Sequence, residues 1–250
     1  MDPRPAIITT RFHHIKTVIA VASGKGGVGK SMIATTLALT FTQQGHRVGL
    51  FDLDVYGPST HLILGTPPTL QPTEDKGIIP PQAHGLSFMS PVFFTQGKPT
   101  PLRGPDITNM ILELLAITQW GPLDYLILDM PPGIGDETLD VIHYLPHCTF
   151  LVVTTPSKVA QGAVDKLLDI LQELHHPILG VLENMTTNHS PTKDIITKRN
   201  LRYLGSLPYD TSLETAVGKP DQILTTPFGQ ALKKLLRTIE RYAASASSNR

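Results

Sequence analysis

Apolar residues gather in six short runs along the chain, and within most runs they are continuous instead of alternating with polar residues. The runs cover residues 17–23, 48–54, 86–90, 125–130, 150–155 and 178–184. Continuous apolar runs of this length are typical of strands that are covered on both faces of a parallel sheet. The pattern therefore predicts six buried strands.

Segments with helical periodicity separate these strands, at residues 30–44, 105–119, 137–144 and 158–175. Alternation of strand and helix implies right-handed crossover connections. We therefore expect an α/β fold with a doubly wound, mostly parallel sheet and helices on both faces. Ligands of such folds bind beyond the carboxyl ends of the strands.

The rest of the chain is less regular. Residues 65–105 are rich in Pro and Gly, and we expect a surface excursion that contains a short strand. A last helix is expected from Pro227, with one apolar stripe that packs on the sheet. We expect an N-terminal extension at residues 1–15, one domain at 16–242 and a disordered tail at 243–250.

Composition narrows the choice of partners. Lys plus Arg and Asp plus Glu both number 21, so no excess charge points to nucleic acid or an acidic membrane. No apolar run approaches the ~20 residues that cross a bilayer, and the N-terminal residues do not resemble a signal peptide. The single cysteine, Cys148, cannot form an internal disulfide, which fits a cytoplasmic location.

The stretch "SGKGGVGKS" joins the first predicted strand to the first helix and matches the phosphate-binding pattern G-x-x-x-x-G-K-[ST]. Backbone N–H groups of such a loop converge on phosphate oxygens, Lys30 offsets their charge and the Ser31 hydroxyl ligates Mg²⁺. The dipole of the following helix adds to the attraction. The predicted nucleotide-binding residues here are Gly24, Lys25, Gly26, Gly27, Val28, Gly29, Lys30, Ser31 and Met32.

Three aspartates follow predicted strands downstream of this loop. Asp52 and Asp54 end the second strand, and residues two apart in a strand point the same way from the sheet. Asp129 ends the apolar run of "YLILDMPPGIGDET", where it can bind Mg²⁺ through water. Pro132 and Gly133 then shape a loop, switch II, that can sense the γ-phosphate.

The additional lysine of the loop, Lys25, makes it resemble the deviant Walker A loop, K-G-G-x-G-K-[ST], of the ParA, MinD, Mrp and nitrogenase-iron-protein ATPases. In that class the lysine reaches across a nucleotide-sandwich dimer, much as an arginine finger does, a contribution worth roughly 10³ to 10⁵ in rate elsewhere. The resemblance implies a homodimer through the nucleotide site. It also implies that Asp54 positions the attacking water and that Asp52 lies near the magnesium shell.

Further segments resemble, in the same order, the Mrp family of ATPases, also called ApbC or Nbp-type iron-sulfur carriers. They are "DLDVYGPS", "LRGPDITNMILELL", "LDYLILDMPPGIGD", "LVVTTPSKVA" and "GVLENM". The resemblance covers residues 16–236. It implies a Mg-ATP-hydrolysing ATPase, with Lys25, Lys30 and Asp54 as its catalytic residues, that acts in iron-sulfur cluster assembly or transfer. It further implies that Asn184 hydrogen-bonds adenine and that Pro208 and Tyr209 flank the base.

The chain departs from that family where a C-P-x-C pair is expected after "ENM", because no cysteine occurs there. Iron-sulfur clusters need thiolate ligands. Cys148 with His143 and His147 offers three other ligands, but Pro146 interrupts their alignment and a small buried thiol is ordinary in a strand. We therefore expect a core role for Cys148.

Two alternatives remain at this point. In one, the chain is a regulatory ATPase that carries no cluster itself and pairs with a cysteine-bearing paralogue or with iron-sulfur apoproteins. In the other, it is a MinD-like positioning ATPase whose last helix lies on a membrane. A DNA-binding role is disfavoured because no basic cluster or DNA-binding motif occurs.

Overall fold

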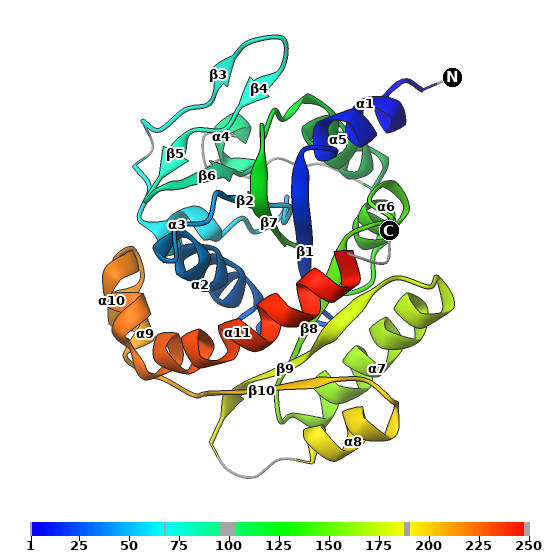
Figure 1. Ribbon diagram of the computed structural model, residues 1–250, viewed down its shortest axis with the longest axis vertical. Coiled ribbons are helices and arrows are strands. Elements are labelled where there is room, and N and C mark those ends of the chain that lie inside the picture. Colours follow the sequence, from blue (N-terminus) through cyan, green and yellow to red (C-terminus); the bar gives the residue numbers. More distant parts are fainter. Residues whose placement is uncertain (1, 68, 96–103, 188–190, 248–250) are drawn as a thin grey trace.

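An eight-stranded sheet forms the centre of the protein in the computed structural model, which describes residues 2–67, 69–95, 104–187 and 191–247 (Figure 1). The strand order is β10-β9-β8-β1-β7-β2-β6-β5. All pairs are parallel except β5 with β6, and a separate antiparallel hairpin joins β3 to β4. The strands are β1 Ile15–Ser23, β2 Val48–Asp52, β3 Thr73–Glu74, β4 Ile78–Ile79, β5 Gln82–Ala83, β6 Leu86–Met89, β7 Leu123–Asp129, β8 Thr149–Thr154, β9 Ile178–Thr186 and β10 Tyr203–Pro208.

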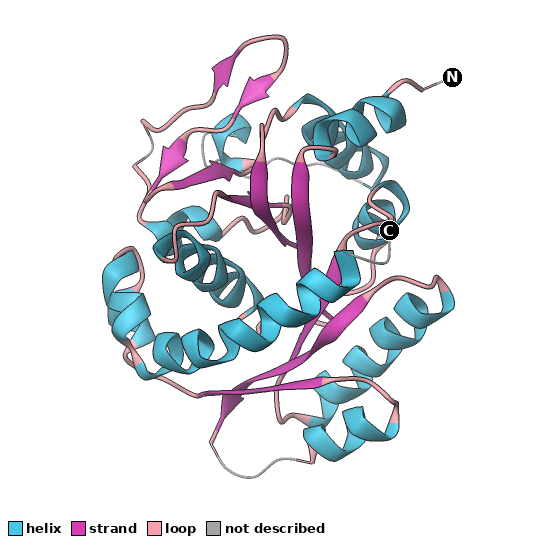
Figure 2. Cartoon of the chain, viewed as in Figure 1, coloured by secondary structure: helices cyan, strands magenta, loops and turns pink. Residues whose placement is uncertain are grey.

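Helices cover both faces of this sheet (Figure 2). One face packs against α2, α10 and α11, and the other packs against α1, α5, α6 and α7. The described helices are α1 Arg4–Phe12, α2 Lys30–Gln43, α3 Thr60–Leu64, α4 Val92–Thr95, α5 Gly104–Ile117, α6 Asp136–Tyr144, α7 Lys158–Glu173, α8 Thr192–Lys198, α9 Leu213–Ala216, α10 Pro220–Thr225 and α11 Pro227–Ser247. The predicted doubly wound α/β fold is confirmed.

The central strand β1 explains why the apolar runs of the sequence are continuous. Every residue of β1 except Lys16 is buried, because β7 and β8 flank the strand and helices cover both of its faces. Ile19 pairs with Ile127 of β7 and with Thr149 of β8. A strand in this position has no solvent-facing side, so it has no polar alternation.

Three sequence expectations need correction. The second strand ends at Asp52, two residues earlier than expected. The excursion holds the short strands β3 to β6 instead of one strand. The tail prediction was wrong at its start, because α11 continues to Ser247 and Ala243 is fully buried. Alanine is the best helix former and prolongs the helix. Residues 248–250 lie outside the described part of the chain.

The last helix packs as predicted. Phe228, Leu232 and Ile239 of α11 are at most 1% exposed and lie in the core beside α2, and Figure 1 shows α11 crossing the sheet next to that helix. The stripe that a membrane-lying helix would need is thus already used in packing. Among the described helices, none combines the length and the apolar character needed to cross a bilayer.

Candidate functional site

The glycine-rich loop lies where β1 ends and α2 begins, at the carboxyl edge of the sheet. Gly27 and Gly29 have φ angles of 76° and 83°, a left-handed conformation that glycine adopts without strain. The predicted residues from Lys25 to Met32 line a cavity of about 340 Å³. Asp54 and Pro132 line the same cavity, so three separated segments of the sequence meet here.

Gly24 serves a packing purpose that the sequence pattern did not reveal. A Cβ atom at this position would lie 2.3 Å from the carbonyl carbon and oxygen of Ala163 in α7. Gly24 does not line the cavity itself. Its role in the structure is to let the backbone of α7 approach the loop closely.

The second loop lysine, Lys30, forms a buried ion pair with Asp129 at the end of β7. Their side chains are 6% and 0% exposed, and Nζ lies 2.5 Å from Oδ1. Burial raises the pKa of Asp129, while the Lys30 ammonium and a hydrogen bond with Ser31 act in the opposite direction.

The other carboxylate oxygen of Asp129, Oδ2, is buried and has no hydrogen-bond partner among the described residues. An unpartnered carboxylate oxygen beside the Ser31 hydroxyl is the hard-oxygen donor set that Mg²⁺ prefers. The residues present therefore fit the predicted magnesium ion.

Asp52 and Asp54 have different surroundings. The fully buried Asp52 carboxylate accepts hydrogen bonds from the Asp54 N–H, at 3.0 Å, and from the Thr60 N–H and hydroxyl, at 3.3 and 2.6 Å. Burial and the nearby charge of Asp129 raise the pKa of Asp52 to about 7. Only Asp54 lines the cavity, and its Oδ1 accepts a hydrogen bond from the Gly57 N–H at 2.9 Å.

β2 ends at Asp52, so the strand alternation from which a common direction of the two carboxylates was expected does not extend to Asp54, and that direction stays a prediction. The importance of Thr60 was missed. It begins α3 and links that helix to Asp52. The signal in the sequence is the Ser59-Thr60 pair ahead of an apolar segment, which is typical of a helix start.

The switch II loop after β7 is tied to the end of β1. The N–H of Gly133 donates to the carbonyl of Ser23 at 3.0 Å, and the N–H of Met130 donates to Val21 at 3.1 Å. Gly133 has a φ of 86°, and the neighbouring Pro132 lines the cavity. The predicted switch II residues therefore lie beside the phosphate loop.

Asn184 lies against the phosphate loop instead of in the cavity. Its Nδ2 donates to the carbonyl of Val28 at 2.9 Å, and its side chain is 3% exposed. A Cβ atom on Gly29 would lie 2.3 Å from the same Nδ2, so the two residues are in close contact. Pro208 and the exposed Tyr209 follow at the end of β10, away from the cavity lining. The adenine contacts of all three stay predictions.

Lys25 is placed differently from Lys30. It is partly exposed, lines the cavity, and forms no ion pair within the described residues. Two large apolar side chains are exposed on segments that border the loop. Tyr56 follows β2 and is 66% exposed, and Val159 of α7 is 72% exposed and lines a shallow hollow next to Gly24.

The surroundings of the chain's cysteine do not resemble an iron-sulfur site. Cys148 is 1% exposed and lies directly before β8, which confirms its predicted core position. Within the described residues, no group of three or more His, Cys, Asp or Glu side chains is arranged to hold a metal ion. A resident iron-sulfur cluster on thiolates of this chain does not fit these residues.

Comparison with known proteins identifies the family of this chain and several similar proteins. The model of a family described as "ParA: NUBPL iron-transfer P-loop NTPase" matches residues 14–242. An "Iron-sulfur cluster carrier protein" of Pseudomonas fragi is 41% identical over 179 residues, which cover 70% of this chain and 62% of the relative. The chain thus spans less than two thirds of that relative's length.

Solved structures show the same architecture. A nucleotide-binding protein from Archaeoglobus fulgidus, solved in complex with ADP, superposes with a TM-score of 0.70 and 29% identity, and the match covers 95% of this chain and 93% of that one. The cell division ATPase MinD of Pyrococcus furiosus gives a TM-score of 0.67 at 17% identity, covering 90% and 99%. At that identity the second match shows the fold alone.

Proposed function

Because the chain belongs to the ParA family of NUBPL-type iron-transfer P-loop NTPases, we propose that it is a Mg-ATP-binding and hydrolysing ATPase. It works as a dimer in the assembly or transfer of iron-sulfur clusters. The observation that carries this proposal is the arrangement of Lys30, Ser31 and Asp129 around the phosphate loop, with Lys25, which has no ion pair among the described residues, at the same cavity.

Binding of ATP depends first on the loop itself. The left-handed glycines Gly27 and Gly29 turn the backbone so that its N–H groups can donate hydrogen bonds to phosphate oxygens. The Lys30 ammonium then pairs with phosphate in place of Asp129. Asp129 is thereby free to hold the metal together with Ser31. Mg²⁺, when bound, neutralises charge on the phosphates. Whether Asp52 contributes to the metal shell stays a prediction.

Hydrolysis requires a water molecule in line with the γ-phosphate. Asp54 lines the cavity and belongs to no ion pair among the described residues, which supports a role in orienting that water and taking its proton. The water oxygen bonds to the γ-phosphorus, the bond to the ADP oxygen breaks, and phosphate leaves. Lys30 and Lys25 offset the charge that moves to the leaving oxygen.

Dimerisation gives Lys25 its role. The partly exposed lysine and the exposed Tyr56 and Val159 lie on segments around the mouth of the site. Large exposed apolar side chains near a charged rim are typical of an interface. Each subunit then supplies Lys25 to its partner's site, so turnover is slow in the monomer and rises with chain concentration.

A complementation experiment tests the shared site. Lys25→Ala and Asp54→Asn are each expected to lose hydrolysis. In an equal mixture, one site of each mixed dimer combines a native Asp54 with a native Lys25 from its neighbour. The mixture should therefore recover about a quarter of the wild-type rate. A mixture no faster than the sum of its parts would contradict a site shared between subunits.

The iron-sulfur role rests on the family and on the relative from Pseudomonas fragi. Since the only thiol, Cys148, is buried, cluster ligands must come from an apoprotein or a cysteine-bearing paralogue. The cluster is then cargo that the ATPase helps to move, not a group that this chain holds.

Anaerobic reconstitution with iron and sulfide tests this role, with and without a cysteine-bearing relative. We expect no stoichiometric iron on the chain alone and ATP-dependent co-elution of the two proteins. Stoichiometric cluster uptake by the chain alone would show that it is itself a carrier. Failure of co-elution would remove the iron-sulfur role and leave the ATPase intact.

A further inference from the structure

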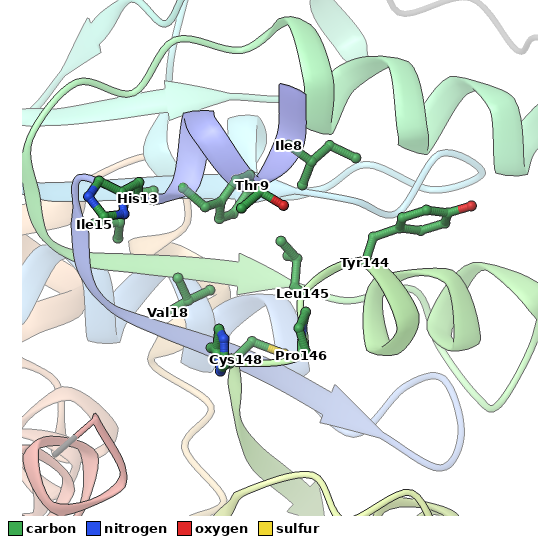
Figure 3. A pocket seen from close by; sticks show the side chains of 11 residues that line it. Ile8, Thr9, His13, Ile15, Val18, Tyr144, Leu145, Pro146 and Cys148 are labelled. Carbon is green, nitrogen blue, oxygen red and sulfur yellow. The ribbon is translucent and has the colours of Figure 1, made fainter. Parts of the chain in front are cut away.

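A second cavity, of about 390 Å³, lies at the opposite edge of the sheet from the phosphate loop (Figure 3). It is formed by α1, by the first residues of β1 and by the connection between α6 and β8. Ile15 at the start of β1 lines this cavity, whereas Ser23 at the end of β1 lines the nucleotide cavity. The two cavities are therefore separated by the length of one strand.

The walls of this second cavity are mainly apolar. Ile8, Val18 and Leu145 are at most 6% exposed, and the buried Cys148 lies among them. Figure 3 shows Ile8 and Thr9 of α1 on one side of the space, with Leu145 and Cys148 on the other. An apolar space of this size, enclosed from two sides, is typical of a small-molecule site.

The polar side chains among the described lining residues are few. They are the exposed His13, His147 and Thr9 and the partly exposed Tyr144. No Asp, Glu, Lys or Arg occurs among the described residues that line the cavity. A charged ligand would therefore be buried without a counter-charge, which is costly. A hydroxyl or carbonyl, in contrast, can pair with an imidazole at the rim.

Size limits the ligand further. A cavity of about 150 Å³ accepts benzene, so this one holds a molecule of roughly 15 non-hydrogen atoms. We propose that the cavity between α1, β1 and the α6–β8 connection binds an uncharged aromatic or alicyclic molecule of this size, with one hydrogen-bonding group directed to the rim. The family model begins at residue 14 and does not include the α1 wall.

Two neighbouring threonines of α1 give a matched pair of variants. Thr9 lines the cavity and Thr10 does not. Both are exposed, and each hydroxyl donates at 3.0 Å to the backbone carbonyl four residues earlier. Thr9→Trp places a large side chain over the opening, whereas Thr10→Trp makes the same change away from it.

The test uses 2-naphthol as the probe, measured by titration calorimetry on the full chain. We expect saturable binding of one molecule per chain, weakened at least about tenfold by Thr9→Trp and little changed by Thr10→Trp. 2-Naphthoate, which has the same rings with a carboxylate, should bind at least about tenfold more weakly.

Three outcomes would overturn the proposal. The first is the absence of saturable 2-naphthol binding. The second is equal affinity of the two tryptophan variants for 2-naphthol. The third is equal affinity of the wild-type chain for 2-naphthol and 2-naphthoate. Affinity for a non-hydrolysable ATP analogue should be unchanged in both variants. This readout separates the second cavity from the nucleotide site, so the proposal does not depend on the proposed ATPase function.

Discussion

Lys30 and Asp129 are joined by a buried ion pair, with 2.5 Å between Nζ and Oδ1, although they lie 99 positions apart in the chain. The lysine begins α2 and the aspartate ends β7, so the pair links the phosphate loop to the strand that carries switch II. In the absence of phosphate, each charge is held by the other. The same two groups are therefore expected to affect both folding and the proposed nucleotide binding.

Removal of Lys30 alone should be strongly destabilising. Lys30→Ala leaves the Asp129 carboxylate buried without its partner, which costs roughly 3–5 kcal/mol in the free energy of unfolding. The double variant Lys30→Ala with Asp129→Asn should recover most of this loss, while ATP binding stays abolished. Urea denaturation of both variants measures the effect.

The ion pair of the exposed Lys16 with Asp124 serves as the control for that experiment. The Lys16 side chain is 71% exposed, so Lys16→Ala should change the free energy of unfolding by at most about 1 kcal/mol. If Lys16→Ala and Lys30→Ala lowered the free energy of unfolding equally, burial of the Lys30–Asp129 pair would make no difference to stability.

Substitution of Gly24 should disturb packing between the phosphate loop and α7. In Gly24→Ala the new Cβ would lie 2.3 Å from the Ala163 backbone, and overpacking of this kind costs about 1–3 kcal/mol. Gly162→Ala, on the same helix, meets no atom within 4 Å and should stabilise by roughly 0.5–1 kcal/mol. Thermal denaturation distinguishes the two, and a Gly24→Ala variant as stable as wild type would refute the close approach.

Asp52 should make stability fall as the pH rises. Its pKa in the folded protein is raised from 3.8 to about 7, so the unfolded chain loses this proton first. The contribution of Asp52 is complete below about pH 4 and is lost as the pH approaches 7. Asp52→Asn has no such proton, so its free energy of unfolding relative to wild type should rise across this window. Urea denaturation at several pH values measures the difference.

Asp124 provides a control of opposite sign. Hydrogen bonds from Arg47 and Lys16 hold the pKa of Asp124 below its usual range. Its contribution is therefore present at neutral pH and lost in acid. Asp124→Asn should be less stable than wild type near pH 7, and the two should converge as the pH falls. The same pH trend in Asp124→Asn and Asp52→Asn would contradict the raised pKa of Asp52.

Lys25 should matter for turnover and not for folding. Lys25→Ala removes a partly exposed ammonium, so the free energy of unfolding should change by no more than about 0.5 kcal/mol. If the lysine acts across the dimer, the maximal rate should fall by roughly 10³-fold or more. Phosphate release against chain concentration measures this, with the exposed Lys198→Ala of α8 as the control. Unchanged turnover in Lys25→Ala would contradict the role.

The sequence predicted the sheet well because each strand carries its own signal. The apolar runs that became β1, β7 and β8 are largely buried, and polar residues occur only towards their ends. The phosphate loop was also predictable, because its spacing of glycine, lysine and serine is set by local backbone geometry. Both features depend on residues that are close together in the chain.

Contacts between distant segments could not be predicted in the same way. Nothing near Gly24 in the sequence shows that Ala163 lies against it, and nothing near Asn184 shows that its amide binds Val28. The different burial of Asp52 and Asp54 could not be predicted either, because β2 stops at Asp52 and strand ends carry weak sequence signals. The helical state of α1 was not predicted. Only Ile8 of its nine residues is buried, so the segment carries a weak apolar pattern.

Cys148 is the only cysteine in the sequence, and it is shielded from solvent. A single engineered thiol, such as Val159→Cys, would therefore accept a maleimide label in preference to the native one. Two spin labels in an assembled pair of chains would then report a defined separation by pulsed electron resonance. The protein thus offers a nearly cysteine-free background for testing the proposed nucleotide-driven assembly in solution.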